Sequence, residues 1–200
     1  MKNIITVYDN FFDDPNNVRE EALKQDFYYC DQLSNTATID EDNDNKILEI
    51  LKIGMTFPGQ RSLLCENILT KIYKEFQKKI LALIPNDNIT INALFQRQTK
   101  NDERNIHQDG NPVLAGVIYL DNNPAPDTGT CFYKHKETGW DGSTEMPTNV
   151  NMIDKTSFEK TSIIENKFNR MIMYNANLVH SAEGARTDRL TVSFFVYPGM

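Results

Sequence analysis

The stretch HQDGNPVLAGVIYLD, residues 107–121, places two potential metal ligands directly before an apolar segment. Residues two apart in an extended chain project to the same face, so the imidazole of His107 and the carboxylate of Asp109 can meet at one ion. A turn of Gly, Asn and Pro at 110–112 separates this pair from the strand expected at 113–121. The stretch therefore predicts a β-structure with a metal-binding pair at the start of one strand.

Strand-like alternation continues through most of the chain after residue 88. Residues 89, 91, 93 and 95 are apolar, and three of the positions between or after them carry Thr90, Asn92 and Gln96. A period of two is the signature of a half-buried strand. Clusters of Asn, Asp, Gly and Pro divide this half, and the pattern predicts strands at 89–98, 113–121, 129–135, 160–165, 168–174 and 189–197.

Helical patterns prevail in the first 88 residues, after a short strand predicted at 3–8. Asp14 and Pro15 predict a helix start, because Asp caps free amides and Pro fits the first turn; this helix is expected to end near Gln25. Ser62 is expected to cap a second helix that follows the turn at 57–61 and extends to about residue 84. Residues 34–45 are polar and acidic and predict a surface loop.

These segments predict an α+β fold that is mainly β, with two helices packed on one side of an antiparallel sandwich or barrel. A chain of 200 residues with 40% hydrophobic content suits a single domain, 1–200. Within it, residues 1–88 are expected to form a helical support region and residues 89–200 the barrel core that carries the site. Residues 136–159 are polar and longer than most connections, which makes them a candidate lid.

Composition limits the partners. A formal net charge of -7 disfavours binding to phosphate backbones, and no nucleic-acid partner is expected. No apolar run is long enough for a signal peptide or a membrane span, so a cytoplasmic protein is expected. The three cysteines form no CxxC pair and predict reduced, mostly buried thiols: Cys30, Cys65 and Cys131.

A third ligand and an anion-binding residue follow downstream. His180 lies 71 residues after Asp109 (180 minus 109), just beyond the strand expected at 168–174. Two imidazoles and one carboxylate on one face of an ion leave positions free for a cofactor and O2, as non-haem Fe(II) oxygenases require. Arg189 begins the last strand, where a bound anion would compensate the cost of burying its charge. Three residues could add hydroxyl donors to the same ligand: Tyr119, Thr191 and Ser193.

The combination of a His-X-Asp pair, a distal His and an Arg nine residues later resembles the 2-oxoglutarate/Fe(II) dioxygenases, especially their prolyl 4-hydroxylase-like branch. The predicted strands around the ligands look like those of the family, and the similarity covers about residues 89–198. Two amino-terminal segments, 12–19 and 57–62, look similar to a branch of such proteins seen in phages and bacteria. A phage-encoded protein would act in the host cytoplasm.

The resemblance implies a double-stranded β-helix, a jelly-roll or cupin-like barrel, with the amino-terminal helices packed on one sheet. It implies Fe(II) and 2-oxoglutarate as cofactors, O2 as co-substrate and ascorbate as a compatible reductant. The implied enzyme hydroxylates a substrate while 2-oxoglutarate is decarboxylated to succinate. The prolyl 4-hydroxylase-like branch implies a peptidyl or prolyl side chain as the substrate. A small metabolite is the alternative.

One position departs from the family pattern. Relatives in this branch tend to carry a Tyr that points at the cofactor where this chain has Arg97, ten residues before His107. Arg97 is therefore expected to contact either the C1 carboxylate of 2-oxoglutarate or an acidic group of the substrate.

Two other functional classes stay open. A non-catalytic metabolite-binding barrel derived from this fold would show a broken ligand set. A zinc hydrolase would use the same ligands, although no HExxH or comparable base motif is present. Of the remaining candidates, His135 lies between two lysines and is expected at a solvated strand end, whereas Trp140 is expected to be a packing anchor rather than a substrate platform.

Overall fold

The computed structural model describes residues 5–29, 57–84, 88–102, 105–183 and 188–199. The surface loop predicted at 34–45 and Cys30 lie outside these ranges. Cys65 and Cys131 are buried free thiols, as the sequence predicts. Within the described residues, no helix combines the length and the apolar character that a membrane crossing requires.

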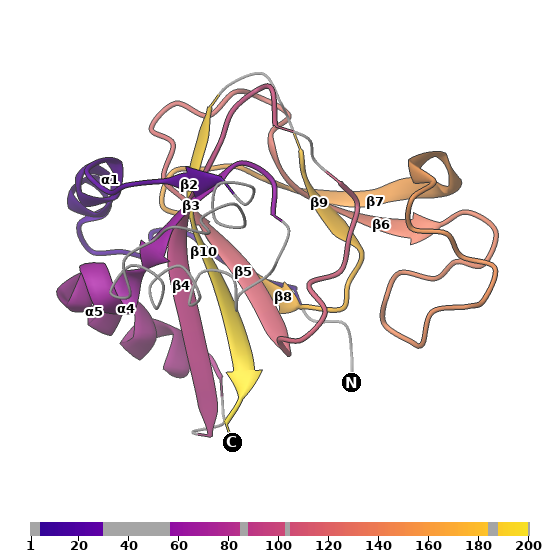
Figure 1. The fold of residues 1–200 in the computed structure, drawn as a ribbon, viewed down its shortest axis with the longest axis horizontal. Coiled ribbons are helices and arrows are strands. Elements are labelled where there is room, and N and C mark those ends of the chain that lie inside the picture. Colours follow the sequence, from indigo (N-terminus) through magenta and orange to yellow (C-terminus); the bar gives the residue numbers. More distant parts are fainter. Residues whose placement is uncertain (1–4, 30–56, 85–87, 103–104, 184–187, 200) are drawn as a thin grey trace, which may run out of the picture.

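Two antiparallel sheets face each other (Figure 1). The larger has seven strands in the order β1 (Ile5–Tyr8), β8 (Met171–Asn175), β5 (Leu114–Tyr119), β10 (Arg189–Pro198), β4 (Ile89–Gln98), β3 (Gln60–Leu64) and β2 (Tyr28–Tyr29). The smaller has three, in the order β7 (Phe158–Glu165), β6 (Gly129–His135) and β9 (His180–Glu183). An isolated bridge between His107 and His180 extends the smaller sheet beyond β9.

Three helices lie on the face of the larger sheet that points away from the smaller one (Figure 1): α1 (Pro15–Leu23), α4 (Cys65–Ile68) and α5 (Thr70–Leu81). Asp14 caps α1 by accepting a hydrogen bond from the Asn17 amide at 3.1 Å. Phe76 of α5 packs against Phe194 of β10, with ring centroids 5.3 Å apart. The helices and this face of the sheet share one hydrophobic core.

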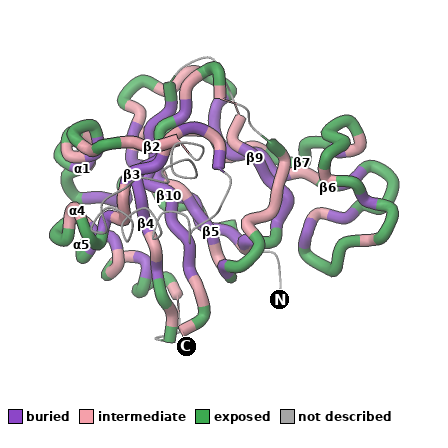
Figure 2. The backbone as a smooth tube through the Cα atoms, in the orientation of Figure 1, coloured by how far each residue is buried: buried purple, intermediate pink, exposed green. Residues whose placement is uncertain are grey.

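Alternation along β10 separates the helix-covered face from the barrel interior. Leu190, Val192 and Phe194 belong to the core under the helices. The intervening side chains therefore point between the two sheets. A second hydrophobic cluster fills part of that interior, and its largest members are Tyr119, Phe132, Tyr174 and Phe195. Figure 2 shows that central strands such as β5, β8 and β10 are buried along most of their length, while the peripheral loops are exposed. Most residues of the edge strands β1 and β7 are exposed or partly exposed.

Most predicted strands are confirmed. The strands at 89–98 and 129–135 have the predicted bounds, and the other four shift by up to three residues. The four-residue strand β9 was missed, because its pairing with β6 and with His107 is non-local.

The start of the second helix was predicted wrongly. Residues 60–64 form β3 instead of a turn and helix cap, and the helices begin at Cys65. The Ser62 hydroxyl accepts a hydrogen bond from the Phe95 amide of β4 at 3.0 Å, so it caps no helix. Pairing with β4 outweighs the local cap signal. Residues 1–88 consequently supply three strands of the larger sheet as well as the helices, and no sheet boundary falls at residue 88.

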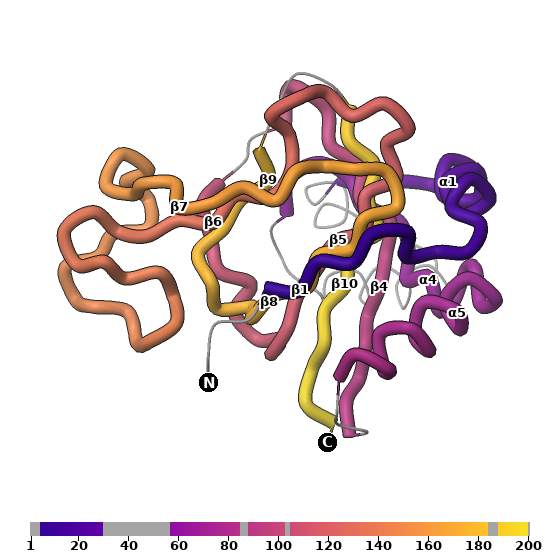
Figure 3. The backbone as a smooth tube through the Cα atoms, turned by 180° about the vertical axis from the view of Figure 1, so that it is seen from behind, coloured from indigo at the N-terminus to yellow at the C-terminus, as the bar shows by residue number. Residues whose placement is uncertain are grey.

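The connection between β6 and β7 forms a lobe at the edge of the barrel, seen from behind in Figure 3. Trp140 is a packing anchor there: it is 5% exposed and belongs to a third hydrophobic cluster with Val150, Phe158 and Val179. The expectation that His135 is solvated was wrong. His135 is buried, and its ring packs edge-on against Phe158 at 5.4 Å.

Candidate metal and cofactor site

The three predicted metal ligands come from two segments that pair with each other. His107 and Asp109 lie before β5, and His180 is the first residue of β9. The backbones of His107 and His180 exchange two hydrogen bonds of 2.9 Å. The Asp109 amide donates to the Ala176 carbonyl, also at 2.9 Å. These bonds fix the His-X-Asp segment against the loop before β9 and bring together residues that are 71 positions apart.

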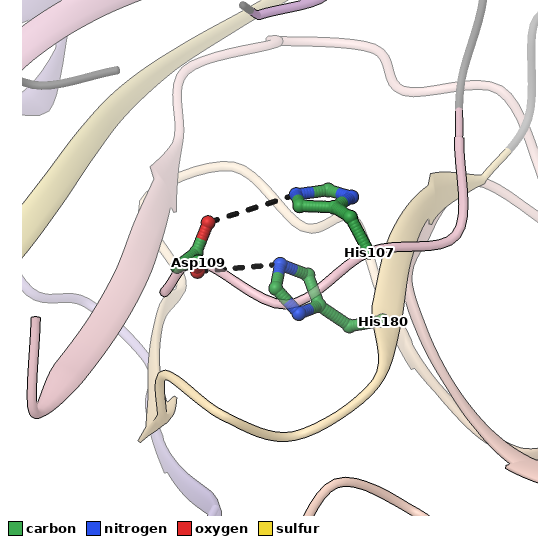
Figure 4. Close-up of side chains that lie close together, drawn as sticks. All are labelled: His107, Asp109 and His180. Carbon is green, nitrogen blue, oxygen red and sulfur yellow. Dashed lines mark ion pairs between the residues drawn. The ribbon is translucent and has the colours of Figure 1, made fainter. Parts of the chain in front are cut away.

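The three side chains point toward one another (Figure 4). Nε2 of His107 lies 3.6 Å from Oδ1 of Asp109, and Nε2 of His180 lies 3.4 Å from Oδ2 of the same carboxylate. One potential ligand atom from each residue lies within 4.8 Å of the others. This spacing is suitable for three ligands that occupy one face of an ion.

Backbone carbonyls set the tautomer of both imidazoles. Nδ1 of His107 lies 2.8 Å from the Asn105 carbonyl, and Nδ1 of His180 lies 2.8 Å from the Leu178 carbonyl. A carbonyl oxygen only accepts, so each neutral ring carries its proton on Nδ1 and presents a lone pair on Nε2. This outer hydrogen bond is typical of metal-binding histidines.

The charge states favour a cation between the ligands. Burial lowers the pKa of His180 to about 4, so this ring is neutral at physiological pH. Burial acts to lower the pKa of His107, but its contact with Asp109 raises this pKa overall. Burial acts to raise the pKa of Asp109, but the neighbouring His180 and the contact with His107 lower it overall. The charge of Arg61 helps to keep the pKa of Asp109 low.

The Asp109 carboxylate supplies the negative charge of the cluster. Its Oδ2 is buried and has no hydrogen-bond partner among the described residues, because it faces the lone pair of His180. Lone pairs that face one another in a buried site are stabilised by a positive ion. The residues present therefore fit a divalent metal.

Arg189 is buried at one end of the β10 face that points into the barrel. Its Nη1 donates to the Gly129 carbonyl at 3.0 Å, and its Nε has no hydrogen-bond partner among the described residues. Its guanidinium carbon lies 5.2 Å from the centre of the Tyr119 ring. A buried guanidinium with a spare donor is suited to bind an anion.

Hydroxyl groups surround this end of the interior. The Tyr119 hydroxyl lies 2.9 Å from the hydroxyl of Thr130. Further along β10, the Thr191 and Ser193 hydroxyls are 3.4 Å apart, and Ser193 donates to Gln96 Oε1 at 2.8 Å. Each of these four hydroxyl residues is buried. The structure thus brings Arg189, Tyr119, Thr191 and Ser193 into the same barrel interior.

Arg97 does not enter the barrel. It is exposed, while its neighbours Gln96 and Gln98 line the cavity that contains the three ligands. The reason is strand geometry, since successive side chains of β4 point to opposite faces. A different arginine, Arg61 of β3, lines this cavity instead and pairs in register with Gln96. Sequence reasoning missed Arg61 because residues 60–64 read as a turn and helix cap.

Comparisons by sequence give one partial match. A family of unknown function, DUF6445, matches residues 143–195, about a quarter of the chain. The matched part includes His180 and Arg189 but not the His-X-Asp pair. No curated protein matches the chain by sequence.

Comparisons by structure match nearly the whole chain. HygX from Streptomyces hygroscopicus, solved with nickel, 2-oxoglutarate and hygromycin B bound, is 15% identical with a TM-score of 0.56, covering 97% of this chain and 82% of HygX. A prolyl hydroxylase from Trichoplax adhaerens, in complex with a hypoxia inducible factor peptide fragment, is 11% identical with a TM-score of 0.55, covering 98% and 84%. The epimerase SnoN, solved with Fe3+, alpha ketoglutarate and nogalamycin RO, is 11% identical with a TM-score of 0.55, covering 98% and 80%.

At these identities the similarity establishes the architecture. The sheet order, the helices on one face and the ligand cluster between the sheets agree with that architecture. The chain has the double-stranded β-helix fold of the 2-oxoglutarate/Fe(II) oxygenases.

Proposed function

We propose that this protein is an Fe(II)- and 2-oxoglutarate-dependent dioxygenase. The observation that carries the proposal is the convergence of three lone-pair-bearing atoms: Nε2 of His107, Nε2 of His180 and Oδ2 of Asp109. This Oδ2 has no hydrogen-bond partner among the described residues. Two imidazoles and one carboxylate on one side of an ion are typical of non-haem iron oxygenases. Structures with the same fold have nickel or iron and 2-oxoglutarate bound.

His107, Asp109 and His180 would hold the metal. When bound, the iron supplies the oxidising chemistry, with O2 as co-substrate and ascorbate as a reductant that maintains the ferrous state. The protein side chains prepare this centre: the Asn105 and Leu178 carbonyls keep both rings in the metal-binding tautomer. Asp109 contributes the charge that partly neutralises a divalent ion.

Arg189 would bind the distal carboxylate of 2-oxoglutarate. The guanidinium is only 6% exposed, so an anion bound there would interact in a largely water-free environment. The hydroxyls of Tyr119, Thr191 and Ser193 would add donors or orient the cofactor. The Tyr119 ring stacks beside the guanidinium and limits its motion.

Hydroxylation of a peptidyl or prolyl side chain, or of a small metabolite, is the finer proposal. The similar structures bind a peptide fragment, hygromycin B or nogalamycin RO, so the fold accommodates substrates of different size. One of them is an epimerase, which means that the fold does not by itself select hydroxylation. Hydroxylation adds one oxygen atom to the product, whereas epimerisation leaves its mass unchanged.

The test begins with anaerobic protein and Fe(II). Adding 2-oxoglutarate should produce a weak visible metal-to-ligand band in the wild type, and O2 should then release succinate. Absence of both 2-oxoglutarate binding and the band would contradict the proposal and favour a non-catalytic barrel. Zinc-dependent hydrolysis without 2-oxoglutarate turnover would support a zinc hydrolase. Mass spectrometry of a cell lysate incubated with the enzyme then separates hydroxylation from epimerisation.

A further inference from the structure

A second arginine lies in the cavity of the three ligands. Arg61 is 7% exposed and belongs to β3, which pairs with β4 on the side opposite β10. Its position is therefore separate from that of Arg189, which lies at the end of β10 beside Tyr119. Both arginines are buried, but only Arg61 lines the cavity together with His107, Asp109 and His180.

Two aromatic rings hold the Arg61 guanidinium in place. Its central carbon lies 4.3 Å from the centre of the Phe57 ring and 5.5 Å from that of Phe195. Both distances are within the range of a cation–π contact. A guanidinium held this way has little conformational freedom to lose when it binds a planar ligand group.

The cavity would be rich in positive charge once a metal is bound. Among the described residues that line it, Asp109 is the carboxylate and Arg61 the permanent cation. A divalent ion at the triad therefore leaves an excess of positive charge among these lining residues. Such a cavity attracts anionic groups.

We propose that Arg61 forms a second carboxylate-binding subsite in this cavity, distinct from Arg189. This inference rests on the proposed function and extends it to the class of ligand that the site accepts. The carboxylate has two potential sources. It is either the C1 carboxylate of 2-oxoglutarate or a carboxylate of the substrate, such as that of a free amino acid or a peptide end. A planar carboxylate matches the forked donors of a guanidinium better than it matches the point charge of an ammonium group.

Three proteins test the subsite: the wild type, Arg61→Gln and Arg61→Lys. Arg97→Gln is the matched control, because Arg97 lies on the neighbouring strand but is exposed outside the cavity. The first measurement is the dissociation constant of 2-oxoglutarate on anaerobic Ni(II)-loaded protein, by calorimetry. The second is ligand-observed NMR on the same proteins with free L-amino acids and short peptides, each paired with its carboxamide.

Two results support the subsite and identify the source. If the C1 carboxylate is bound, Arg61→Gln weakens 2-oxoglutarate binding by roughly tenfold or more, which is the effect of losing one charged hydrogen-bonding partner. If the substrate supplies the carboxylate, 2-oxoglutarate binding stays within about twofold and the free acids lose binding to Arg61→Gln by a similar factor. Arg61→Lys should recover only part of the loss in either case, and Arg97→Gln should match the wild type.

The subsite is overturned if Arg61→Gln equals the wild type in both measurements, or if carboxamides bind as well as the free acids while 2-oxoglutarate binding is unchanged. This outcome differs from a failure of the proposed function, in which the wild type itself binds no 2-oxoglutarate. In that case the free acids and carboxamides alone decide the subsite. Thermal unfolding of each variant excludes misfolding as the cause of lost binding.

Discussion

Replacing Arg189 by Met should weaken cofactor binding and leave the folded protein as stable as before, or more stable. Arg189 is 6% exposed and makes one hydrogen bond among the described residues, from Nη1 to the Gly129 carbonyl. Its Nε is buried and has no hydrogen-bond partner in the part of the chain that the structure describes. In the absence of an anion, the desolvated charge costs free energy that a methionine of similar length avoids.

The expected loss of affinity follows from the donors that become unavailable. A hydrogen bond to a charged group contributes about 1.5–3 kcal/mol, so losing one or two of them from a bound carboxylate costs about 3 kcal/mol. At 1.4 kcal/mol per factor of ten, this corresponds to a 2-oxoglutarate dissociation constant that is roughly 100-fold larger. The free energy of unfolding should stay the same or rise, because replacing a buried charge by an apolar group of similar size is often neutral or stabilising.

Calorimetric titration of 2-oxoglutarate into anaerobic Ni(II)-loaded protein measures the affinity, and urea unfolding of the metal-free protein measures stability. Arg170→Met is the control, since Arg170 pairs with Asp9 at 2.6 Å beside the end of β1 and the start of β8, outside the cavity. It should lose stability but keep its affinity for 2-oxoglutarate. An Arg189→Met protein that binds 2-oxoglutarate within threefold of the wild type would show that Arg189 is not the anchor of the distal carboxylate.

Three further outcomes are expected. Asp109→Asn removes the charged ligand and should reduce Fe(II) affinity by roughly 100-fold, which metal competition with a chromophoric chelator measures; unchanged affinity would exclude Asp109 as a ligand. Trp140→Ala should destabilise the protein by about 3 kcal/mol in urea, since the side chain is 5% exposed and fills a hydrophobic cluster, and a loss below 1 kcal/mol would contradict this role. Contacts with Arg170 and Lys167 hold the pKa of Asp9 far below its usual value, so their contribution to stability is present above the unfolded pKa of about 4 and is lost as the pH falls through the folded pKa. Asp9→Asn should therefore cost about 1 kcal/mol at neutral pH and progressively less at acidic pH, and a constant difference across this range in pH-dependent urea unfolding would refute the assignment.

The three candidate metal ligands could be singled out from the sequence because much of their pattern is local. His107 and Asp109 are two residues apart and share a strand face by geometry alone. His180 follows one predicted strand and Arg189 begins another, and the chain has only three histidines, which leaves few combinations to consider. The structure places these four residues between the two sheets, as the patterns indicate.

Which other side chains line the cavity depended on the pairing of strands, and no local sequence pattern specifies that pairing. The segment 60–64 has a plausible helix cap at Ser62, yet it forms β3 because β4 offers it an open edge and the Phe95 amide a hydrogen-bond donor. This pairing points the Arg61 side chain into the barrel. The same register turns Gln96 inward and Arg97 outward, so the cationic residue expected in the cavity came from a different strand.

The fate of His135 has the same origin. Two flanking lysines predict solvent exposure, but β7 pairs with β6 and places Phe158 against the ring of His135. The burial of a residue depends on which segments of the chain pack together. Contacts between segments that are distant in the sequence cannot be recognised from the residues of one strand alone.

The sequence by itself determined the mainly β architecture, the ligands of the candidate metal site and the arginine that begins the last strand. The alternation of apolar and polar residues and the spacing of ligands can be recognised directly in the order of residues along the chain. Only the tertiary structure decided which side chains complete the cavity, because strand order and register are fixed by long-range pairing. A shift of one residue exchanges the two faces of a strand, and this is why the cavity contains Arg61 and excludes Arg97.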